Sequence, residues 1–327
     1  MLRRLLCSAP AAAFAMLLLG ASFAWAGMGQ PSPGEMGFQG AASPVAEEIH
    51  KFYDFVNIII VAITVFVMLL LLYVIYRFSE SANPTPSTVT HNTILEVAWT
   101  VVPILILVAI AIPSFRLLNL QYSYPKSDLT LKATGYTWYW EHAYPELGIT
   151  FETRMLDEAG LEELKAQNLP AVRNLSVDNE VIVPLNKVVT VLITAAPDGV
   201  IHDWTIPSFG SKVDAVPGRI TSTWFKPTVE GIFYGQCSEL CGKDHAFMPI
   251  GVRVVKEEVF ASWTDTMKLA NEAGKAAGAE KDKEKRKQLN QQKKELLEKA
   301  KGIVRQAALE QAGVRQFAKT GDTARAN

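Results

Sequence analysis

The sequence predicts a membrane-anchored all-β protein, in which a hairpin of two transmembrane helices comes before a β-sandwich or barrel and a charged tail follows it. Two observations predict this fold class: a pair of long apolar segments, and a run of short alternating strands over residues 128–256. With 327 residues, the chain is long enough for one well-buried domain with appendages or for two domains.

Residues 1–26 have the three parts of a secretory signal peptide. A basic "MLRR" comes before the apolar "AAAFAMLLLG", and "AWA" provides a small-residue cleavage site before Gly27. A first membrane anchor is the alternative, but the apolar run is short for a span. Cleavage would remove Cys7, leave Cys237 and Cys241, and place the new N-terminus on the outer side of a membrane, in a bacterial periplasm.

Two apolar segments predict a transmembrane hairpin over residues 49–119, after an extended segment at 27–48 that is rich in Gly, Pro, Ser and Ala. We expect the helices at about 52–78 and 94–118. Each is long enough to cross the hydrocarbon layer, and neither has the polar stripe of a helix in a soluble protein. Given the signal peptide, the short link between them lies inside and the rest of the chain lies outside.

Glu96 lies near the inner end of the second apolar segment. A carboxylate at that depth is costly unless it faces protein or water, so the residue is a candidate functional group. The alternative is a carboxylate at the membrane surface whose side chain reaches the aqueous phase.

Short strands separated by turns predict the all-β domain, which we place at residues 120–263. The stretch "LTLKATGYTWYWEHAY" alternates and is rich in β-branched and aromatic residues, and "VIVPLNKVVTVLITA" predicts two strands about a Pro-Leu-Asn-Lys turn. The sequence contains no glycine-rich phosphate loop, G-x-S-x-G elbow or HExxH motif, so it does not indicate the enzymes that use them.

Charge divides the chain into an acidic body and a basic tail. Residues 120–263 contain 12 Lys and Arg against 18 Asp and Glu, whereas residues 264–327 contain 15 against 9. The acidic body favours cationic partners. The tail predicts a solvated helix or a partly disordered extension, and contact with acidic protein or anionic lipid is the other interpretation. No nucleic acid partner is expected, because no aromatic residues are interleaved with the basic residues of the tail.

The stretch "YGQCSELCGKDHAFMPI" collects metal-binding side chains. Cys237, Cys241, His245 and Met248 lie within twelve positions, and their thiol, imidazole and thioether groups together favour copper. A tight loop between two strands would bring all four side chains together.

A second imidazole must come from elsewhere in the chain. His202 and His142 are the candidates inside the all-β domain. We expect His202, because a strand comes before it and a Trp-Thr-Ile-Pro turn follows, which gives a ligand a fixed position.

Three alternatives compete with a copper site. In a periplasm, Cys237 and Cys241 could form a disulfide. A structural zinc site would use four Cys or His ligands, and Met248 would not be expected among them. Taken alone, that methionine would more often be a core residue than a ligand. The complete set of ligand types favours copper.

The cysteine-containing stretch resembles the copper-binding loop of subunit II of the cytochrome c oxidases, in the haem-copper oxidase superfamily. The resemblance extends to "HDWTIPSFGSKVDAVPGR", which corresponds to the segment of the family's first histidine ligand, and to the aromatic "GYTWYWEHAYP". "LEVAWTVVP" resembles the family's second membrane helix, and "MGFQGAASP" its mature N-terminus. The resemblance covers residues 36–263 and excludes the tail at 264–327.

The resemblance implies a cupredoxin-like Greek-key β-barrel with a dinuclear copper A centre, in which two cysteines bridge two copper ions and each of two histidines binds one. The implied ligands are the side chains of His202, Cys237, Cys241, His245 and Met248 and the backbone carbonyl of Glu239. The Glu239 side chain would bind a Mg or Mn ion at the contact with subunit I.

The resemblance also implies partners. The chain would accept electrons from cytochrome c, soluble or membrane-bound, and pass them to haem in subunit I, which would hold all the haems, reduce oxygen to water and pump protons. Subunit III and membrane lipid would be further contacts. The location would be the bacterial inner membrane, with the copper domain and tail in the periplasm.

Single residues acquire roles by the same resemblance. Trp138 matches the tryptophan that receives the electron from cytochrome c, and Glu96 matches an acid near the mouth of a proton-uptake path into subunit I. The family's usual "GHQWYW" is "GYTWYW" here, and Ala143 replaces the acid that follows it. The candidate docking acids are Glu141, Glu146, Glu152, Asp178, Asp198 and Asp214. Taken alone, each acid would be a solvated charge and Trp138 a half-buried strand residue.

Two other function classes fit parts of the sequence. A membrane-anchored copper carrier or thiol-redox protein would use a Cys-x3-Cys pair at an exposed, exchangeable site. The related quinol oxidase subunit II is a structural subunit without the copper ligands, all of which are present here.

Overall fold

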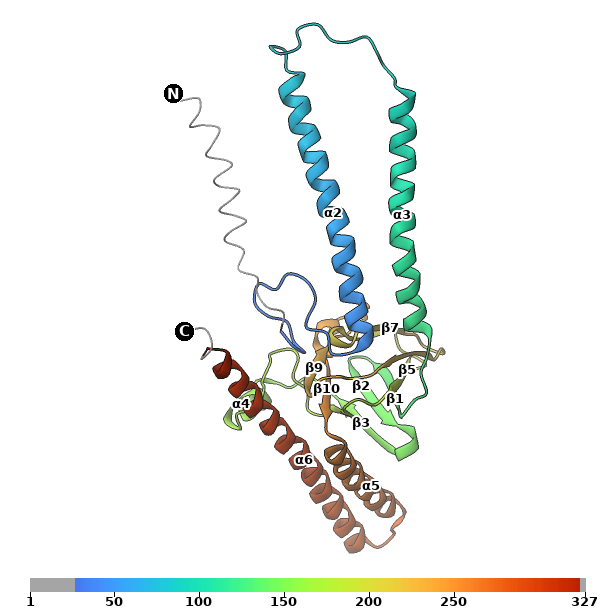
Figure 1. Ribbon diagram of the computed structural model, residues 1–327. Helices are drawn as coiled ribbons and strands as arrows, with labels where there is room; N and C mark the ends of the chain where they lie inside the picture. Colours follow the sequence, from blue (N-terminus) through green and yellow to red (C-terminus); the bar gives the residue numbers. More distant parts are fainter. Residues whose placement is uncertain (1–26, 324–327) are drawn as a thin grey trace.

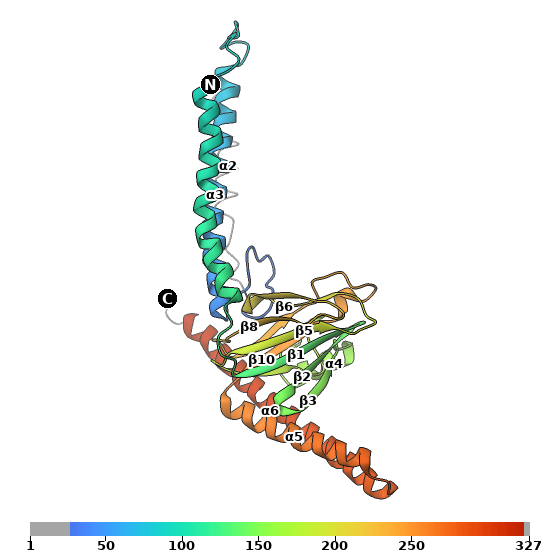
Figure 2. The same ribbon diagram turned by 90° about the vertical axis from the view of Figure 1, so that its right-hand side faces the viewer.

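The computed structural model describes residues 27–323, so the predicted signal peptide at 1–26 lies outside the described residues. A β-sandwich forms the centre of the molecule. Two long helices extend from one side of it, and a second pair of helices packs on the opposite side (Figures 1 and 2).

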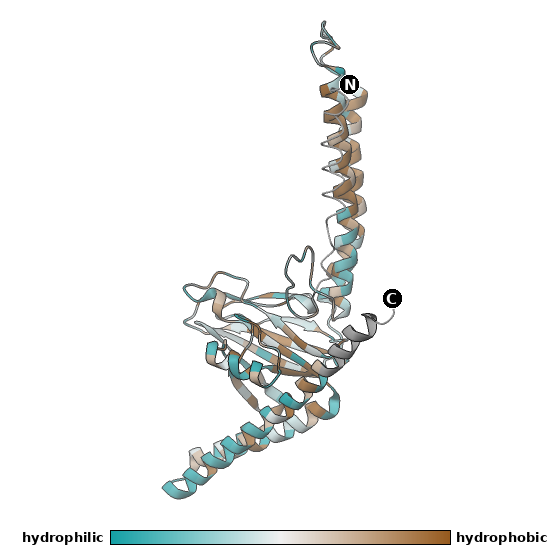
Figure 3. Cartoon of the chain, turned by 90° about the vertical axis from the view of Figure 1, so that its left-hand side faces the viewer, coloured by the Kyte–Doolittle hydropathy of each residue, from teal (hydrophilic) through white to brown (hydrophobic). Residues whose placement is uncertain are grey.

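The first helix pair is the predicted apolar hairpin. Helix α2 (Pro44–Arg77) and helix α3 (Thr93–Tyr122) are each long and apolar enough to cross a membrane (Figure 3). Helix α2 begins earlier than the predicted residue 52, because the Ser43 hydroxyl caps it by accepting the Ala46 N–H at 3.1 Å and the polar first turns continue below the apolar part. The apolar pattern marked only the membrane-spanning part of this helix.

The predicted all-β domain is confirmed as a β-sandwich. Its larger sheet has the order β3-β2-β1-β5-β8, the smaller sheet has the order β4-β10-β9, and β6 and β7 form a separate hairpin. Strands β1 and β5 are parallel, as are β10 and β4. The strands are β1 (Leu129–Tyr136), β2 (Tyr139–Tyr144), β3 (Ile149–Thr153), β4 (Val181–Pro184), β5 (Val189–Ala195), β6 (His202–Ile206), β7 (Ser211–Ala215), β8 (Thr221–Phe225), β9 (Gly231–Gly235) and β10 (Ile250–Val255). One short helix, α4 (Glu158–Ala166), lies in the connection between β3 and β4.

The core follows from the alternation of the strands. In β2 the side chains of Trp140, His142 and Tyr144 point inward and are fully buried, while the intervening residues are partly exposed. All six residues of β10 are buried, because the sandwich core covers one face of the smaller sheet and the C-terminal helices cover the other.

The tail forms a helical hairpin that belongs to the same core. Helix α5 (Glu257–Ala279) crosses the predicted boundary at 263/264, and helix α6 (Lys283–Thr323) returns along it (Figure 2). Trp263 and Met267, one turn apart on α5, are buried against the sandwich. Few apolar residues carry this contact, which is why the sequence pattern indicated a solvated extension.

A buried polar contact fastens α6 to the sandwich. Arg253 of β10 is 4% exposed and pairs with Glu180, and its guanidinium also donates to Gln311 of α6 at 3.1 Å. The Gln311 amide in turn donates to the Val254 carbonyl at 2.9 Å. Both partners of the buried guanidinium are therefore needed to satisfy it.

Removing residues 283–327 is expected to lower the melting temperature by roughly 5 °C or more, because it uncovers one side of the smaller sheet and removes a partner of Arg253. Copper binding is expected to persist, since the candidate ligands come from β6 and the loop before β10. Thermal unfolding and metal analysis of the full and truncated chains, in the same detergent, check both points. Loss of copper on truncation would contradict this division of the chain.

Candidate metal centre

The candidate ligands come from two parts of the sandwich. His202 is the first residue of β6, while the other ligands lie on the loop between β9 and β10. A single bridge between Trp204 and Cys237 fixes the start of this loop against β6. The predicted ligand loop and the predicted distant histidine therefore meet at one end of the sandwich.

All the donor atoms predicted from the sequence lie close together. The two sulfurs of Cys237 and Cys241 are 3.7 Å apart, and the imidazole Nδ1 of His202 is 3.8 Å from the Cys237 sulfur. On the other side, the Cys241 sulfur is 3.5 Å from Nδ1 of His245 and 3.6 Å from the Met248 sulfur. The ligand atoms of His202 and both cysteines lie within 4.8 Å of one another.

A backbone oxygen completes the set. The Glu239 carbonyl is 3.3 Å from the Cys237 sulfur, whereas the Glu239 residue is exposed. The two cysteines are free thiols, and their sulfurs are farther apart than the length of about 2.05 Å that a disulfide requires. The geometry gathers two thiols, two imidazoles, a thioether and a carbonyl at one end of the sandwich.

The sulfur donors of the site are buried. The side chains of Cys237, Cys241 and Met248 are 5%, 3% and 1% exposed. Burial, together with the neighbouring Cys237, raises the pKa of Cys241 to about 12, and burial with the nearby His245 lowers the pKa of His202 to about 4. The Nε2 atom of His202 is buried without a hydrogen-bond partner among the described residues. A soft metal that displaces thiol protons and accepts imidazole nitrogen fits this donor set.

Close packing fixes the ligands. A Cβ atom at Gly135 would lie 2.7 Å from the His202 ring, so only glycine lets β1 approach the imidazole. The Trp140 indole donates to the Met248 carbonyl at 3.1 Å and positions the end of the loop. These contacts hold the His202 ring against β1 and the end of the ligand loop against β2.

Trp138 lies against the ligand loop. Its indole N–H donates to the Cys241 carbonyl at 3.0 Å, and its ring packs on Gly242, where a Cβ would come within 3.1 Å. Gly242 has a φ of +116°, which other residues rarely adopt. The partly exposed Trp138 ring is thus joined directly to the backbone of a candidate ligand.

His142 does not join the ligand set. Its Nε2 accepts from the Trp204 indole at 3.4 Å, and its Nδ1 lies 2.9 Å from the Thr153 hydroxyl, which itself donates to the Asn179 carbonyl. This chain of bonds assigns a neutral imidazole with its proton on Nδ1. Sequence reasoning missed the network, although the alternation of β2 places His142 on the same inward face as Trp140.

The network gives a prediction for acid stability. Burial lowers the pKa of His142 from 6.5 to about 3, so the unfolded chain takes up a proton at a higher pH than the folded one. The stabilising contribution is complete above pH 6.5 and is lost as the pH falls towards 3, by at most about 1.4 kcal/mol per pH unit. Denaturant unfolding between pH 7 and 4 should therefore be less pH-dependent in His142→Phe than in the wild-type chain. Equal slopes in the two proteins would show that His142 does not contribute.

The other candidate residues lie away from the ligands. Glu96 is in the first turn of α3, which the Asn92 side chain caps. Glu141 lies opposite Glu152 across β2 and β3, and Glu152 pairs with Arg154 at 2.9 Å. The remaining candidates are exposed and come from the turn after β2, the β3–β4 connection, the turn after β5 and strand β7: Glu146, Asp178, Asp198 and Asp214.

The described fold and the ligand geometry define a class of protein: a β-sandwich on a two-helix membrane hairpin, with a buried cysteine–histidine–methionine cluster that fits copper. The profile of "Cytochrome C oxidase subunit II, periplasmic domain" matches residues 129–255, and that of "Cytochrome C oxidase subunit II, transmembrane domain" matches residues 31–117. The chain belongs to the cytochrome c oxidase subunit II family and is anchored to a membrane as a subunit of that oxidase.

Relatives agree with this assignment. Cytochrome c oxidase subunit 2 of Cereibacter sphaeroides is 48% identical over 250 residues, which cover 73% of this chain and 82% of the relative. The probable cytochrome c oxidase subunit 2 of Rickettsia bellii (strain RML369-C) is 47% identical over 248 residues, which cover 76% of this chain and 88% of the relative. The crystal structure of the periplasmic domain of subunit II of cytochrome oxidase of Bradyrhizobium japonicum is 52% identical, covers 45% of this chain and 97% of that one, and has a TM-score of 0.39.

Proposed function

We propose that this chain accepts electrons from cytochrome c at a dinuclear copper A centre and passes them to haem in subunit I. Oxygen would be reduced to water there, with proton pumping, and the haems would all lie in subunit I. The single observation that carries the proposal is the chain of close contacts, each between 3.3 and 3.8 Å, that links all six donor groups.

The residues fit two ions rather than one. Two thiols four positions apart can each bridge both ions, whereas a mononuclear blue-copper site uses one thiolate. His202 approaches the Cys237 sulfur and His245 approaches the Cys241 sulfur, so each imidazole has its own side of the sulfur pair. When bound, the copper pair supplies a one-electron couple shared between two ions. The buried, packed ligands keep their places in both oxidation states.

Trp138 is the proposed point at which the electron enters the chain. Its partly exposed ring faces solvent between β1 and β2, and its indole bonds to the Cys241 carbonyl. An electron that reaches the indole is therefore one hydrogen bond away from the backbone of Cys241, whose side chain is a proposed copper ligand. The acidic body around the site favours a cytochrome c with a lysine-rich surface, held by some of the six candidate carboxylates.

Two further roles are proposed at the contact with subunit I. The Glu239 side chain is exposed while its carbonyl points at the cluster, which leaves the carboxylate free to bind a Mg or Mn ion. Glu96, at the start of α3, would lie near the mouth of a proton-uptake path. The two roles would place subunit I beside the ligand loop and the helix pair, and subunit III would be a further contact.

The proposed location is the bacterial inner membrane, with the sandwich and tail in the periplasm. The signal-like residues 1–26 support this orientation, since they would deliver the next segment to the outer side. The two apolar helices then return the chain to that same side.

Copper analysis with electron paramagnetic resonance on the full chain in detergent tests the proposal. Two copper ions per chain that share one unpaired electron, seen as hyperfine coupling to both nuclei, are the expected result. One copper, or rapid loss of copper to a weak chelator, would instead indicate a copper carrier. Copper-free protein with Cys237 and Cys241 oxidised to a disulfide would also exclude electron transfer at this site.

A further inference from the structure

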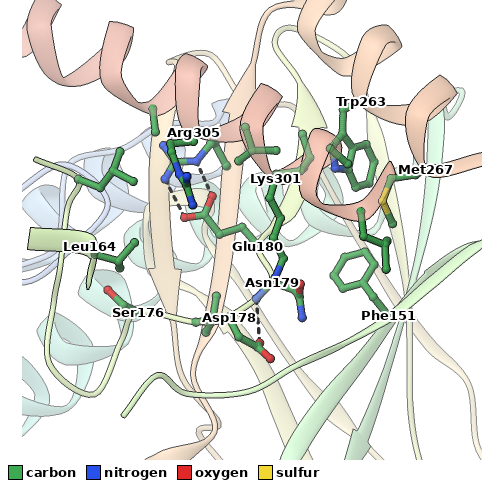
Figure 4. Close-up of a pocket in the computed structure, with 18 of the residues that line it drawn as sticks. Phe151, Leu164, Ser176, Asp178, Asn179, Glu180, Trp263, Met267, Lys301 and Arg305 are labelled. Atoms are coloured by element: carbon green, nitrogen blue, oxygen red, sulfur yellow. Dashed lines mark hydrogen bonds and ion pairs between the residues drawn. The ribbon is translucent and has the colours of Figure 1, made fainter. Parts of the chain in front are cut away.

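A second site lies between the sandwich and the tail. A cavity of about 340 Å³ lies between β3, the β3–β4 connection, α5 and α6 and opens to the surface, where Lys301 and Arg305 are exposed (Figure 4). Its volume is within the range of about 300–1,000 Å³ that is usual for small-molecule sites. None of the candidate metal ligands lines it, so its occupant would be independent of the electron-transfer function.

Much of the cavity wall is apolar. Phe151 of β3 lies across from Trp263 and Met267 of α5, and Leu164 and Leu297 contribute aliphatic surface from α4 and α6 (Figure 4). Aromatic faces and a flexible thioether suit an apolar body of variable shape. A simple inorganic ion would leave this surface without a contact.

The polar part of the wall is mainly cationic. Arg253 and Glu180 line the cavity but neutralise each other in a buried ion pair. Lys293, Lys301 and Arg305 of α6 make no ion pair with any residue that the structure describes. The wall has one further acidic group, the carboxylate of Asp178, which already accepts the backbone N–H groups of Arg154 and Asn179. The excess of positive charge favours an anion.

We propose that this cavity binds an anionic amphiphile, namely a carboxylate with a medium-length apolar chain. The carboxylate lies at Lys301 and Arg305, where charge-assisted hydrogen bonds are available. The apolar chain lies between Phe151 and the side chains of Trp263 and Met267. Figure 4 shows Lys301 reaching into the space between Arg305 and these apolar residues.

The experiment uses the full chain in bilayer discs of zwitterionic phosphatidylcholine. The probe is decanoate that carries a photoreactive diazirine, and decanol with the same group is the uncharged control. After irradiation, peptide mass spectrometry locates the labels. Decanoate is expected to label β3, the first half of α5 and the middle of α6, while decanol labels mainly the apolar helices α2 and α3.

Matched variants separate charge from shape. Lys301→Gln with Arg305→Gln is expected to reduce cavity labelling by about tenfold, as the loss of one or more charge-assisted hydrogen bonds would. Leu297→Trp, which fills the cavity and keeps its charge, is expected to reduce it as well. Lys294→Gln with Lys299→Gln, which changes two exposed lysines of α6 that do not line the cavity, should leave it unchanged.

Three results would overturn the proposal. The first is decanoate labelling that is confined to the membrane helices. The second is cavity labelling that is equal for decanoate and decanol. The third is cavity labelling that persists in both the charge variant and the Leu297→Trp variant. Because copper is not involved in any step, these results would leave the proposed electron-transfer function untouched.

Discussion

Replacing Cys241 by serine is expected to abolish the proposed dinuclear copper centre. The Cys241 sulfur contacts three other candidate donors: the Cys237 sulfur, the His245 imidazole and the Met248 thioether all lie within 3.7 Å. A hydroxyl is a hard ligand that binds soft metal ions poorly. We expect copper affinity to fall by more than about 100-fold, since even the loss of groups that only support metal ligands costs 10- to 100-fold.

The measurement is copper content per chain together with the electron paramagnetic resonance spectrum. In Cys241→Ser, coupling to two copper nuclei should disappear, and at most one ion should remain. Ser238→Ala is a suitable control, because Ser238 is an exposed residue of the same loop whose hydroxyl donates to the Gln236 carbonyl and contacts no candidate ligand. Full copper occupancy in the serine variant would contradict the assignment of Cys241 as a bridging ligand.

Copper loading should also depend on pH in a definite direction. The pKa of Cys241 is raised to about 12 by burial and by Cys237, so this thiol is protonated at neutral pH until a metal displaces its proton. Each proton released makes binding about tenfold tighter per pH unit. Competition with a chelator of known affinity between pH 6 and 8 is expected to show tighter binding at the higher pH. A pH-independent affinity would mean that copper binds without displacing a thiol proton.

The candidate ligand set could be proposed from the sequence because most of it is local. Cys237, Cys241, His245 and Met248 lie on one loop, so their spacing is visible in the chain. His202 is far away, and the reason for choosing it was wrong: instead of a strand before it and a turn after it, strand β6 begins at His202 and includes the residues expected to form the turn. The sequence could not show that Gly135 leaves room for its ring, because that contact depends on how β1 and β6 pack.

The tail shows the opposite case. Trp263 and Met267 carry its contact with the sandwich, and two apolar residues among many charges form too weak a pattern to predict packing. The Gln311 contact with Arg253 joins residues 58 positions apart, and nothing in either local sequence indicates it. The cavity follows from this packing, so it too was invisible before the fold was known.

Replacing Trp138 by phenylalanine is expected to slow electron transfer from cytochrome c while the copper spectrum stays unchanged. Phenylalanine keeps an aromatic ring at this position but cannot donate to the Cys241 carbonyl, which is 3.0 Å from the indole nitrogen. The side chain is partly exposed and contributes no candidate ligand, so the copper site should remain intact. We expect the transfer rate to fall by roughly tenfold or more, equivalent to about 1.4 kcal/mol in activation free energy.

The rate of copper reduction by reduced cytochrome c, followed by stopped-flow absorbance on the assembled oxidase, is the measurement. Trp224→Phe is a matched control, because the Trp224 indole donates to the Gln121 carbonyl at 3.2 Å near the membrane helices. The Trp224→Phe variant also loses a hydrogen bond from an indole to a backbone carbonyl, yet it should accept electrons at the wild-type rate. A normal rate in Trp138→Phe would exclude Trp138 as the entering point of the electron. A slow rate with an altered copper spectrum would show instead that the indole acts by positioning the Cys241 backbone.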